Sequence, residues 1–149
     1  MTLVVYKPEE VAVQLGVSTR TVVSLCGSGA IRARKIGQVW RIPAWLFKDP
    51  GETLVAAARG RSRVYFIEAE GLGLVKIGVT INVRMRMRAL QYMSPAKLTL
   101  AAKLPGSRVL ESWLHTRFAS ERSHGEWFRK TAELDEYIQC LLAVAKGAA

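Results

Sequence analysis

The chain alternates short helix-like and strand-like patterns of apolar residues, which fall into two blocks. In the first block, apolar residues recur with helical spacing over Pro8–Leu15 and again over Thr19–Cys26. Pro8 in the first turn, Gly16 after the first helix and Ser18 before the second are typical of helix boundaries. Because so few residues join them, the two patterns predict a helix-turn-helix.

A basic, β-rich stretch follows these helices. Residues 33–36 and 39–42 favour strands, and Gly37-Gln38 fits a two-residue turn between them. The hairpin is expected to form a wing, followed by a short closing helix over 44–47. On the second helix, one side is expected to be apolar and the other polar: Val22, Val23, Leu25 and Cys26 against Arg20, Thr21 and Ser24.

The second block combines strands and helices. Strands are predicted over 64–67, 74–79 and 98–103, with a turn at 70–73, and helices from Asn82 onward, over 108–120 and over 133–145. Between the blocks, Asp49–Arg63 begins with Asp-Pro-Gly and ends in a glycine-containing basic run, which predicts a linker with a short helical piece. The chain is therefore expected to be an α+β protein with a first domain at 1–48, a linker at 49–62 and a second domain at 63–149.

Composition narrows the class of partner. The 149 residues carry a formal net charge of +10, which favours a polyanion, most often nucleic acid. No apolar run is long enough to span a membrane, and no signal-peptide pattern is present at the N-terminus. Cys26 and Cys140 lie far apart and outside any metal-ligand spacing, so a reduced, cytoplasmic protein is expected.

Three arginines alternate with two methionines over residues 84–88. A strand would place all the arginines on one face, but Asn82 is a good N-cap and favours a helix. In a helix, Arg84 and Arg88 lie close together, whereas Arg86 falls among the apolar positions Val83, Met85, Ala89 and Leu90. A charge directed inward needs a partner. Arg86 is therefore expected to form a structural ion pair, to snorkel to solvent, or to line a pocket for an anion.

The helix predicted over 108–120 places an acid and a histidine beside its apolar stripe. Leu110, Leu114 and Phe118 form the stripe, and Glu111 and His115 lie one turn apart at its edge. This pair has three interpretations: a surface pair, half of a zinc site, or one oxygen ligand of Mg²⁺ near a phosphate. No second pair of ligands has usable spacing, which argues against zinc.

The first block resembles the excisionase-type winged helix-turn-helix, which is related to MerR-type DNA-binding domains. The resemblance lies in YKPEEVAVQLGVSTRTV and in GAIRARKIGQVWRIP, with Trp40 and Trp45 as expected core residues. It implies that the second helix enters the major groove and that the wing contacts the backbone or minor groove. The residues implied to face DNA are Arg20, Thr21 and Ser24 on the helix and Arg32, Arg34, Lys35 and Gln38 on the wing. A protein-interaction module is the alternative.

The second block resembles the GIY-YIG nuclease family. The motifs VYFI, KIG, ESWLHTRF and GEWF occur in order, with Arg86 between the second and third. The resemblance implies a small domain with a three-stranded antiparallel sheet and flanking helices. It also implies hydrolysis of DNA phosphodiesters with one divalent metal, Mg²⁺ or Mn²⁺.

The motif positions imply roles for individual residues. Tyr65 corresponds to the first motif tyrosine, Lys76 replaces the second, Gly78 is the motif glycine, Arg86 is the active-site arginine and Glu111 the metal ligand. Nearby cations are expected to lower the pKa of Tyr65, so that it accepts a proton from water. His115 is an alternative base or a phosphate ligand, and Arg84 and Arg88 are expected to contact the DNA backbone.

The sequence thus favours a metal-dependent endonuclease acting on double-stranded DNA. Two alternatives remain: a catalytically inactive, excisionase-like DNA-binding regulator, and a protein that binds or cleaves RNA. A wing of this type favours DNA, because the deep groove of A-form RNA is closed to side chains. One single-metal site cuts one strand at a time, so a double-strand break needs two encounters or two copies, as in a homodimer.

Overall fold

A computed structural model describes residues 5–44 and 49–147 of the protein. The first predicted helices are confirmed as α1 (Pro8–Leu15) and α2 (Thr19–Ser28). Gly16 ends α1 in the left-handed conformation, with φ 67°, and Ser18 Oγ caps α2 by accepting from the Thr21 amide at 3.1 Å. The helix-turn-helix therefore forms as its local boundary signals predict.

The wing is a small antiparallel sheet with one unforeseen strand. β2 (Arg34–Ile36) and β3 (Val39–Pro43) form the predicted hairpin, with a turn at Gly37-Gln38. β1 (Val5–Tyr6) pairs with the other edge of β3, which gives the order β1-β3-β2. Trp40 is half-buried and packs against the core, whereas Trp45 and the closing helix expected at 44–47 fall largely outside the described residues.

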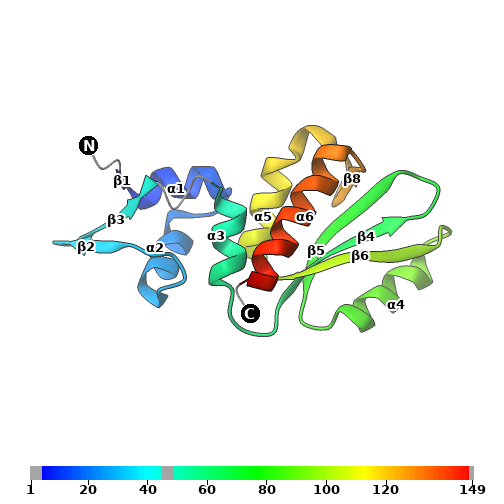
Figure 1. Ribbon diagram of the computed structural model, residues 1–149, viewed down its shortest axis with the longest axis horizontal. Helices are drawn as coiled ribbons and strands as arrows, with labels where there is room; N and C mark the ends of the chain where they lie inside the picture. The colour runs from blue at the N-terminus through cyan, green and yellow to red at the C-terminus, as the bar shows by residue number, and fades with distance from the viewer. Residues whose placement is uncertain (1–4, 45–48, 148–149) are drawn as a thin grey trace.

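The segment between the blocks is a packed helix rather than a free connection. α3 (Pro50–Ala57) follows Asp49, whose side chain accepts from the Glu52 amide at 3.1 Å. Leu54 and Val55 on α3 are buried, at 8% and 1% exposure, in the core that both blocks share. Figure 1 shows α3 between the helix-turn-helix and the helices of the second block. The predicted linker therefore holds the two blocks together.

The second block is built on a five-stranded antiparallel sheet. β4 (Arg63–Ala69), β5 (Leu74–Thr80) and β6 (Leu98–Pro105) are the three expected strands. A further hairpin, β7 (Arg122–His124) and β8 (Trp127–Arg129), gives the order β6-β4-β5-β8-β7. The expectation of three strands is thus incomplete, because the GEWF motif contributes to a hairpin that pairs with β5.

Helices cover both faces of this sheet. α5 (Arg108–Arg117) and α6 (Ala132–Gly147) pack on the face that carries Val64, Phe66 and Ile77. α4 (Val83–Met93) covers the other face, over Tyr65, Ile67 and Leu98. A short 3₁₀ helix, η2 (Ala119–Glu121), leads from α5 into β7. No helix in the described part of the chain has the length and apolar character needed to span a bilayer.

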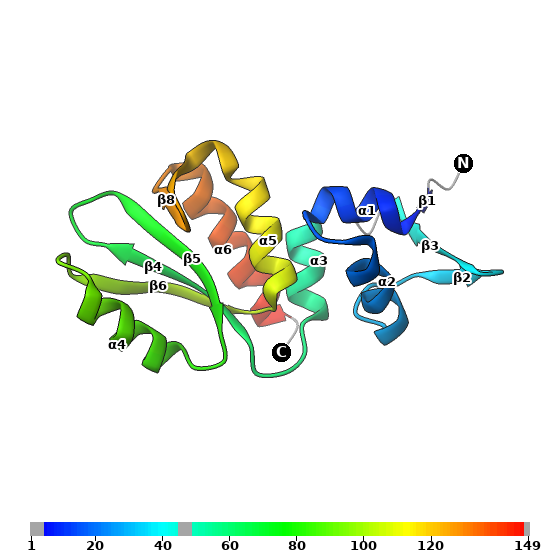
Figure 2. The same cartoon turned by 180° about the vertical axis from the view of Figure 1, so that it is seen from behind.

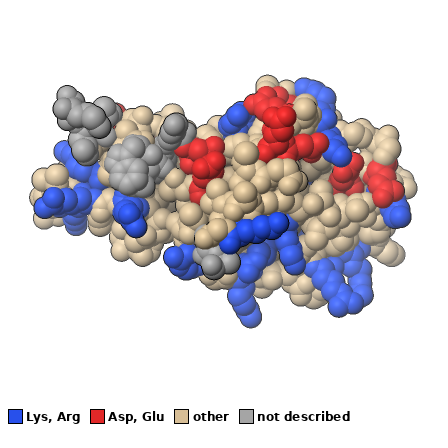
Figure 3. Space-filling view, in the orientation of Figure 1, with Lys and Arg blue, Asp and Glu red and all other residues tan. Residues whose placement is uncertain are grey.

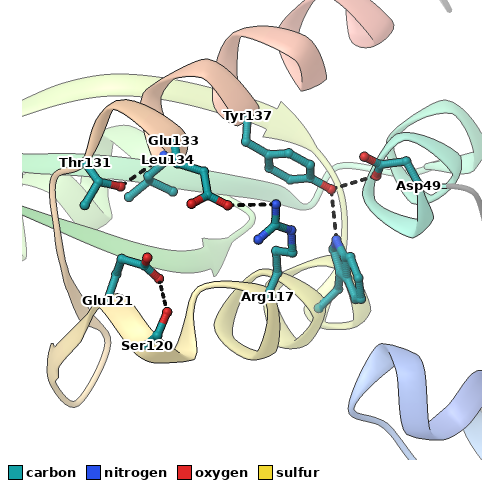
Figure 4. A network of polar contacts seen from close by, with 9 residues as sticks. Asp49, Arg117, Ser120, Glu121, Thr131, Glu133, Leu134 and Tyr137 are labelled. Atoms are coloured by element: carbon teal, nitrogen blue, oxygen red, sulfur yellow. Dashed lines mark hydrogen bonds and ion pairs between the residues drawn. The ribbon is translucent and has the colours of Figure 1, made fainter.

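A chain of hydrogen bonds joins three helices at the junction between the blocks. The Trp113 indole donates to the Tyr137 hydroxyl at 3.0 Å, and that hydroxyl donates to Asp49 Oδ1 at 2.7 Å. Figure 4 shows Tyr137 reaching from α6 toward Asp49 at the start of α3. A side chain on Gly51 would collide with the Tyr137 hydroxyl, so glycine is needed for this approach.

Candidate active site

The candidate site lies where the sheet leaves one edge of β5 open. β8 pairs with β5 only over Leu74–Lys76, so β5 has no strand partner on that side beyond Lys76. Two groups occupy this edge instead. The Ile77 amide donates to the Glu126 carbonyl at 3.1 Å, and the His115 ring lies 2.9 Å from the Ile77 carbonyl. The hairpin turn and α5 therefore converge on one point of β5.

Tyr65 forms the floor of the site. It lies on the central strand β4 opposite Gly78 of β5, and its side chain is fully buried. A β-carbon on Gly78 would collide with the Tyr65 ring, so the hydroxyl end of the ring lies directly over the glycine. The Tyr65 hydroxyl is buried with no hydrogen-bond partner among the described residues. An unsatisfied buried hydroxyl is costly, so a polar partner at this point would stabilise the site.

The prediction that nearby cations lower the pKa of Tyr65 is wrong for the protein without bound ligands. Burial raises the pKa of Tyr65, and the Arg86 guanidinium opposes this only in part. Arg86 acts on the phenol as a nearby cation, although the two groups do not meet the geometry of a formed hydrogen bond. Lys76, the cation expected to lower this pKa, is engaged elsewhere. Tyr65 is therefore a neutral phenol at physiological pH.

Arg86 reaches the site from α4, but not by pointing into the sheet. Asn82 caps α4 as predicted, accepting from the Met85 amide at 3.0 Å. The packing face of α4 consists of Val83, Met87 and Leu90, whereas Met85 is 68% exposed. The side of α4 that packs on the sheet therefore differs from the predicted one, because it contains Met87 in place of Met85. Arg86 is an exposed residue at the border of this packing face.

Lys76 forms an ion pair across the site. Its ammonium donates to Glu126 Oε2 at 2.7 Å, and its side chain is only 13% exposed. It also lies over the Trp127 ring, 5.6 Å from the centroid. The hydrogen bond from Lys76 lowers the pKa of Glu126. Lys76 thus lies between β4 and β8 inside the sheet, not on the solvent face of an edge hairpin.

Glu111 and His115 face the same edge from α5. Burial raises the pKa of Glu111, with a further contribution from the Glu126 charge, and His115, Arg108 and Lys76 oppose the shift. Because a carbonyl oxygen only accepts, the His115 Nε2–H must donate to Ile77. Nδ1 is then the unprotonated nitrogen of the neutral ring, and it can accept a proton.

The residues present fit a single hard cation rather than a multi-ligand metal centre. Within residues 5–44 and 49–147, no three His, Cys, Asp or Glu side chains lie close enough together to hold a metal. Glu111 is a half-buried carboxylate whose raised pKa reflects incomplete compensation of its charge. Mg²⁺ commonly takes one or two carboxylates and completes its shell with water and phosphate oxygens. Glu111 suits that mode, and zinc is disfavoured.

Sequence reasoning left the role of one residue in this cluster open. Glu126 stands in the GEWF motif, and its position became clear only when the β7–β8 turn placed it beside Lys76. His124 on β7 is exposed, and its Nδ1 lies 3.2 Å from Ser123 Oγ. The GEWF motif was the feature of the sequence that could have identified Glu126 as a site residue. A cavity of about 550 Å³ lies elsewhere, at the junction lined by Leu25, Leu54 and Arg59.

The residues expected to contact DNA form separate exposed surfaces. Arg20 and Ser24 are exposed on α2, together with Val23, which was expected on the apolar side but is 40% exposed. The Thr21 hydroxyl lies 2.8 Å from Ser18 Oγ, so it is tied to the helix cap. The remaining residues are exposed on or beside the wing and on α4: Arg32, Arg34, Lys35, Gln38, Arg84 and Arg88.

Two family models match the chain. A family model described as the T5orf172 domain matches residues 62–144, and one described as a helix-turn-helix domain matches residues 5–49. Searches of curated proteins and of solved structures gave no match. The helix-turn-helix domain indicates DNA binding, and the T5orf172 domain is nuclease-like. The chain therefore belongs to the T5orf172 domain family and carries an N-terminal helix-turn-helix domain.

Proposed function

We propose that the protein is a metal-dependent endonuclease that hydrolyses phosphodiester bonds in double-stranded DNA. The observation that carries the proposal is the convergence of Tyr65, Arg86, Glu111 and His115 on the open edge of β5, beside the Lys76–Glu126 pair. The nuclease-like family and the order of GIY-YIG-type motifs support the same chemistry. The helix-turn-helix domain would deliver this site to DNA.

Arg86 supplies the fixed positive charge that the reaction needs. Attack on a phosphodiester adds negative charge to the phosphoryl oxygens, and a positioned cation stabilises that charge. Arg86 is exposed, has no acidic partner in the described ion pairs, and lies beside the Tyr65 hydroxyl. Its guanidinium is therefore free to donate to a phosphate. Lys76 is held by Glu126 and acts as a second, less mobile charge.

His115 is the better placed proton acceptor in this cluster. Its Nε2–H is fixed on the Ile77 carbonyl, which leaves Nδ1 able to take a proton from the attacking water. Tyr65 is a poorer base because burial raises its pKa. Its hydroxyl is suited instead to orient the water or a phosphate oxygen by a hydrogen bond, which also satisfies the buried group.

Glu111 is the residue that would hold the divalent cation, Mg²⁺ or Mn²⁺. When bound, such a cation offsets the charge that accumulates on the phosphate and leaving group. The Glu111 carboxylate must be ionised for this role, and a cation would favour its ionised form. One carboxylate leaves most of the coordination shell to water and to DNA, so binding of cation and DNA should be coupled.

The direct test is nicking of supercoiled plasmid by the full chain, in Mg²⁺ and in EDTA. The proposal expects conversion to the open-circular form in Mg²⁺ only. Salt-dependent DNA binding without cleavage in Mg²⁺ or Mn²⁺ would instead identify a DNA-binding regulator.

A further inference from the structure

One side of the molecule carries Lys and Arg side chains with few acidic neighbours. In Figure 3, Lys and Arg side chains lie over the wing, over the segment between α3 and β4, and over α4. On the opposite side in the same view, acidic side chains gather with further Lys and Arg side chains among them. In this view, positive charge without acidic neighbours therefore lies along one side of an elongated molecule.

Two segments outside the helix-turn-helix together contribute six arginines that have no acidic partner in the described ion pairs. The segment 59–63 contains Arg59, Arg61 and Arg63 and no acid, and α4 contains three arginines and no acid. No ion pair in the described part of the chain involves any of these side chains. Arg59 and Arg63 donate to neighbouring carbonyls, whereas Arg61 is exposed and forms no described hydrogen bond. Uncompensated charges of one sign suit a polyanion.

These segments lie on the same side as the helix expected to enter the major groove. Figures 1 and 2, seen from opposite directions, both place α2, the α3–β4 connection and α4 along the lower side of the molecule. Their relative positions are held by α3, through buried Leu54 and Val55 and through the Asp49–Tyr137 hydrogen bond. The basic surfaces therefore keep one fixed arrangement.

We propose that one DNA duplex lies along this side and contacts the helix-turn-helix, the 59–63 segment and α4 in the same complex. This proposal rests on the proposed function, which gives double-stranded DNA as the ligand. A duplex carries regularly spaced phosphates along its length, which matches basic groups spread over three elements. The segment between the domains is then a DNA contact in its own right, and the cut falls at a fixed distance from the site held by α2.

The test compares Arg61→Gln with a matched control, Arg122→Gln. Arg122 is an exposed arginine of β7 whose guanidinium lies over the Phe128 ring, and the β7–β8 hairpin lies on the side of the molecule away from the 59–63 segment. Binding to a duplex of about 30 base pairs, roughly three helical turns, is measured in EDTA over a range of salt concentrations. Arg61→Gln should weaken binding about two- to fivefold and lower the salt slope by about 0.9, the value for one phosphate contact. Arg122→Gln should change neither.

A stoichiometric titration of the wild-type chain completes the test. One duplex bound per chain, with the Arg61→Gln effect, supports the proposal. Two duplexes per chain, an unchanged salt slope for Arg61→Gln, or an effect of Arg61→Gln on double-stranded RNA or polyglutamate but not on DNA would overturn it. The binding measurements in EDTA do not depend on cleavage. A protein that binds DNA but never cuts it would therefore pass this binding test and fail the plasmid assay.

Discussion

The Lys76 ammonium lies 2.7 Å from Glu126 Oε2, and this pair joins β5 to the β7–β8 turn at the edge of the candidate site. The lysine is nearly buried, whereas the Glu126 side chain is 45% exposed. The pair therefore fixes a cation near Glu111 while remaining open to solvent on one side.

Glu126→Gln should destabilise the protein by about 1 kcal/mol, because it leaves a nearly buried ammonium with a weaker partner and solvent screens part of the loss. The pKa of Glu126 is lowered in the folded protein, mainly by the hydrogen bond from Lys76. The stabilisation from this carboxylate is thus present above its ordinary pKa of 4.5 and is lost as the pH falls through the lowered value. Urea unfolding at pH 7 and at pH 3 measures both effects. If the free energies of unfolding of wild type and Glu126→Gln differed by the same amount at both pH values, the stabilising role of the Lys76–Glu126 pair would be contradicted.

Gly78→Ala should displace the tyrosine from the floor of the site. The added methyl group would collide with the Tyr65 ring, which is fully buried. We expect a loss of about 2 kcal/mol in the free energy of unfolding. Gly27→Ala on α2, where a β-carbon meets nothing within 4 Å, is the control. Equal stability of Gly78→Ala and Gly27→Ala would show that the ring does not lie over Gly78.

Glu111→Gln should raise stability at neutral pH while abolishing cleavage. Because burial raises the pKa of Glu111, the folded state favours the protonated carboxyl. Stability then falls as the pH rises through the ordinary pKa of 4.5 and the higher folded value, and a glutamine avoids that loss. Thermal unfolding at pH 4 and pH 8 should show an advantage of the variant that grows with pH. A variant that is less stable than wild type at pH 8 would mean that Glu111 is well compensated.

Tyr137→Phe should weaken the junction between the domains. The change removes the hydroxyl that accepts from Trp113 and donates to Asp49, and both partners are half-buried. We expect a loss of about 1–2 kcal/mol in the free energy of unfolding. Protease cleavage within 49–63 should also become faster. Unchanged protease resistance would indicate that apolar packing of α3 alone holds the junction.

The local parts of the fold were predictable because their signals are local. Ser18, Asn82 and Ser107 each cap the helix that follows, and the predicted apolar stripe of Leu110, Leu114 and Phe118 is buried. The short strands β7 and β8 were not foreseen, because three-residue strands form only where a neighbouring strand offers an edge.

The site was predictable as a set of residues but not as a geometry. Motif order pointed to Tyr65, Arg86 and Glu111, whereas the partner of Lys76 lies 50 residues away and is fixed only by tertiary pairing. The orientation of Arg86 was misjudged because residues on either side of it are apolar. Packing against Tyr65, Ile67 and Leu98 selected Met87 over Met85 for the buried side. The connection at 49–63 looked like a linker because its packing partners are on distant helices.

The most direct test of the account measures DNA cleavage and DNA binding together for wild type, Glu111→Gln and Arg86→Ala. Each protein is incubated with supercoiled plasmid in Mg²⁺, and its affinity for a linear duplex is measured in EDTA. The account predicts nicking by wild type alone, with binding retained by Glu111→Gln. Nicking that persists in both variants would show that another site does the chemistry. Binding without nicking by the wild-type protein in either Mg²⁺ or Mn²⁺ would contradict the assignment of a nuclease.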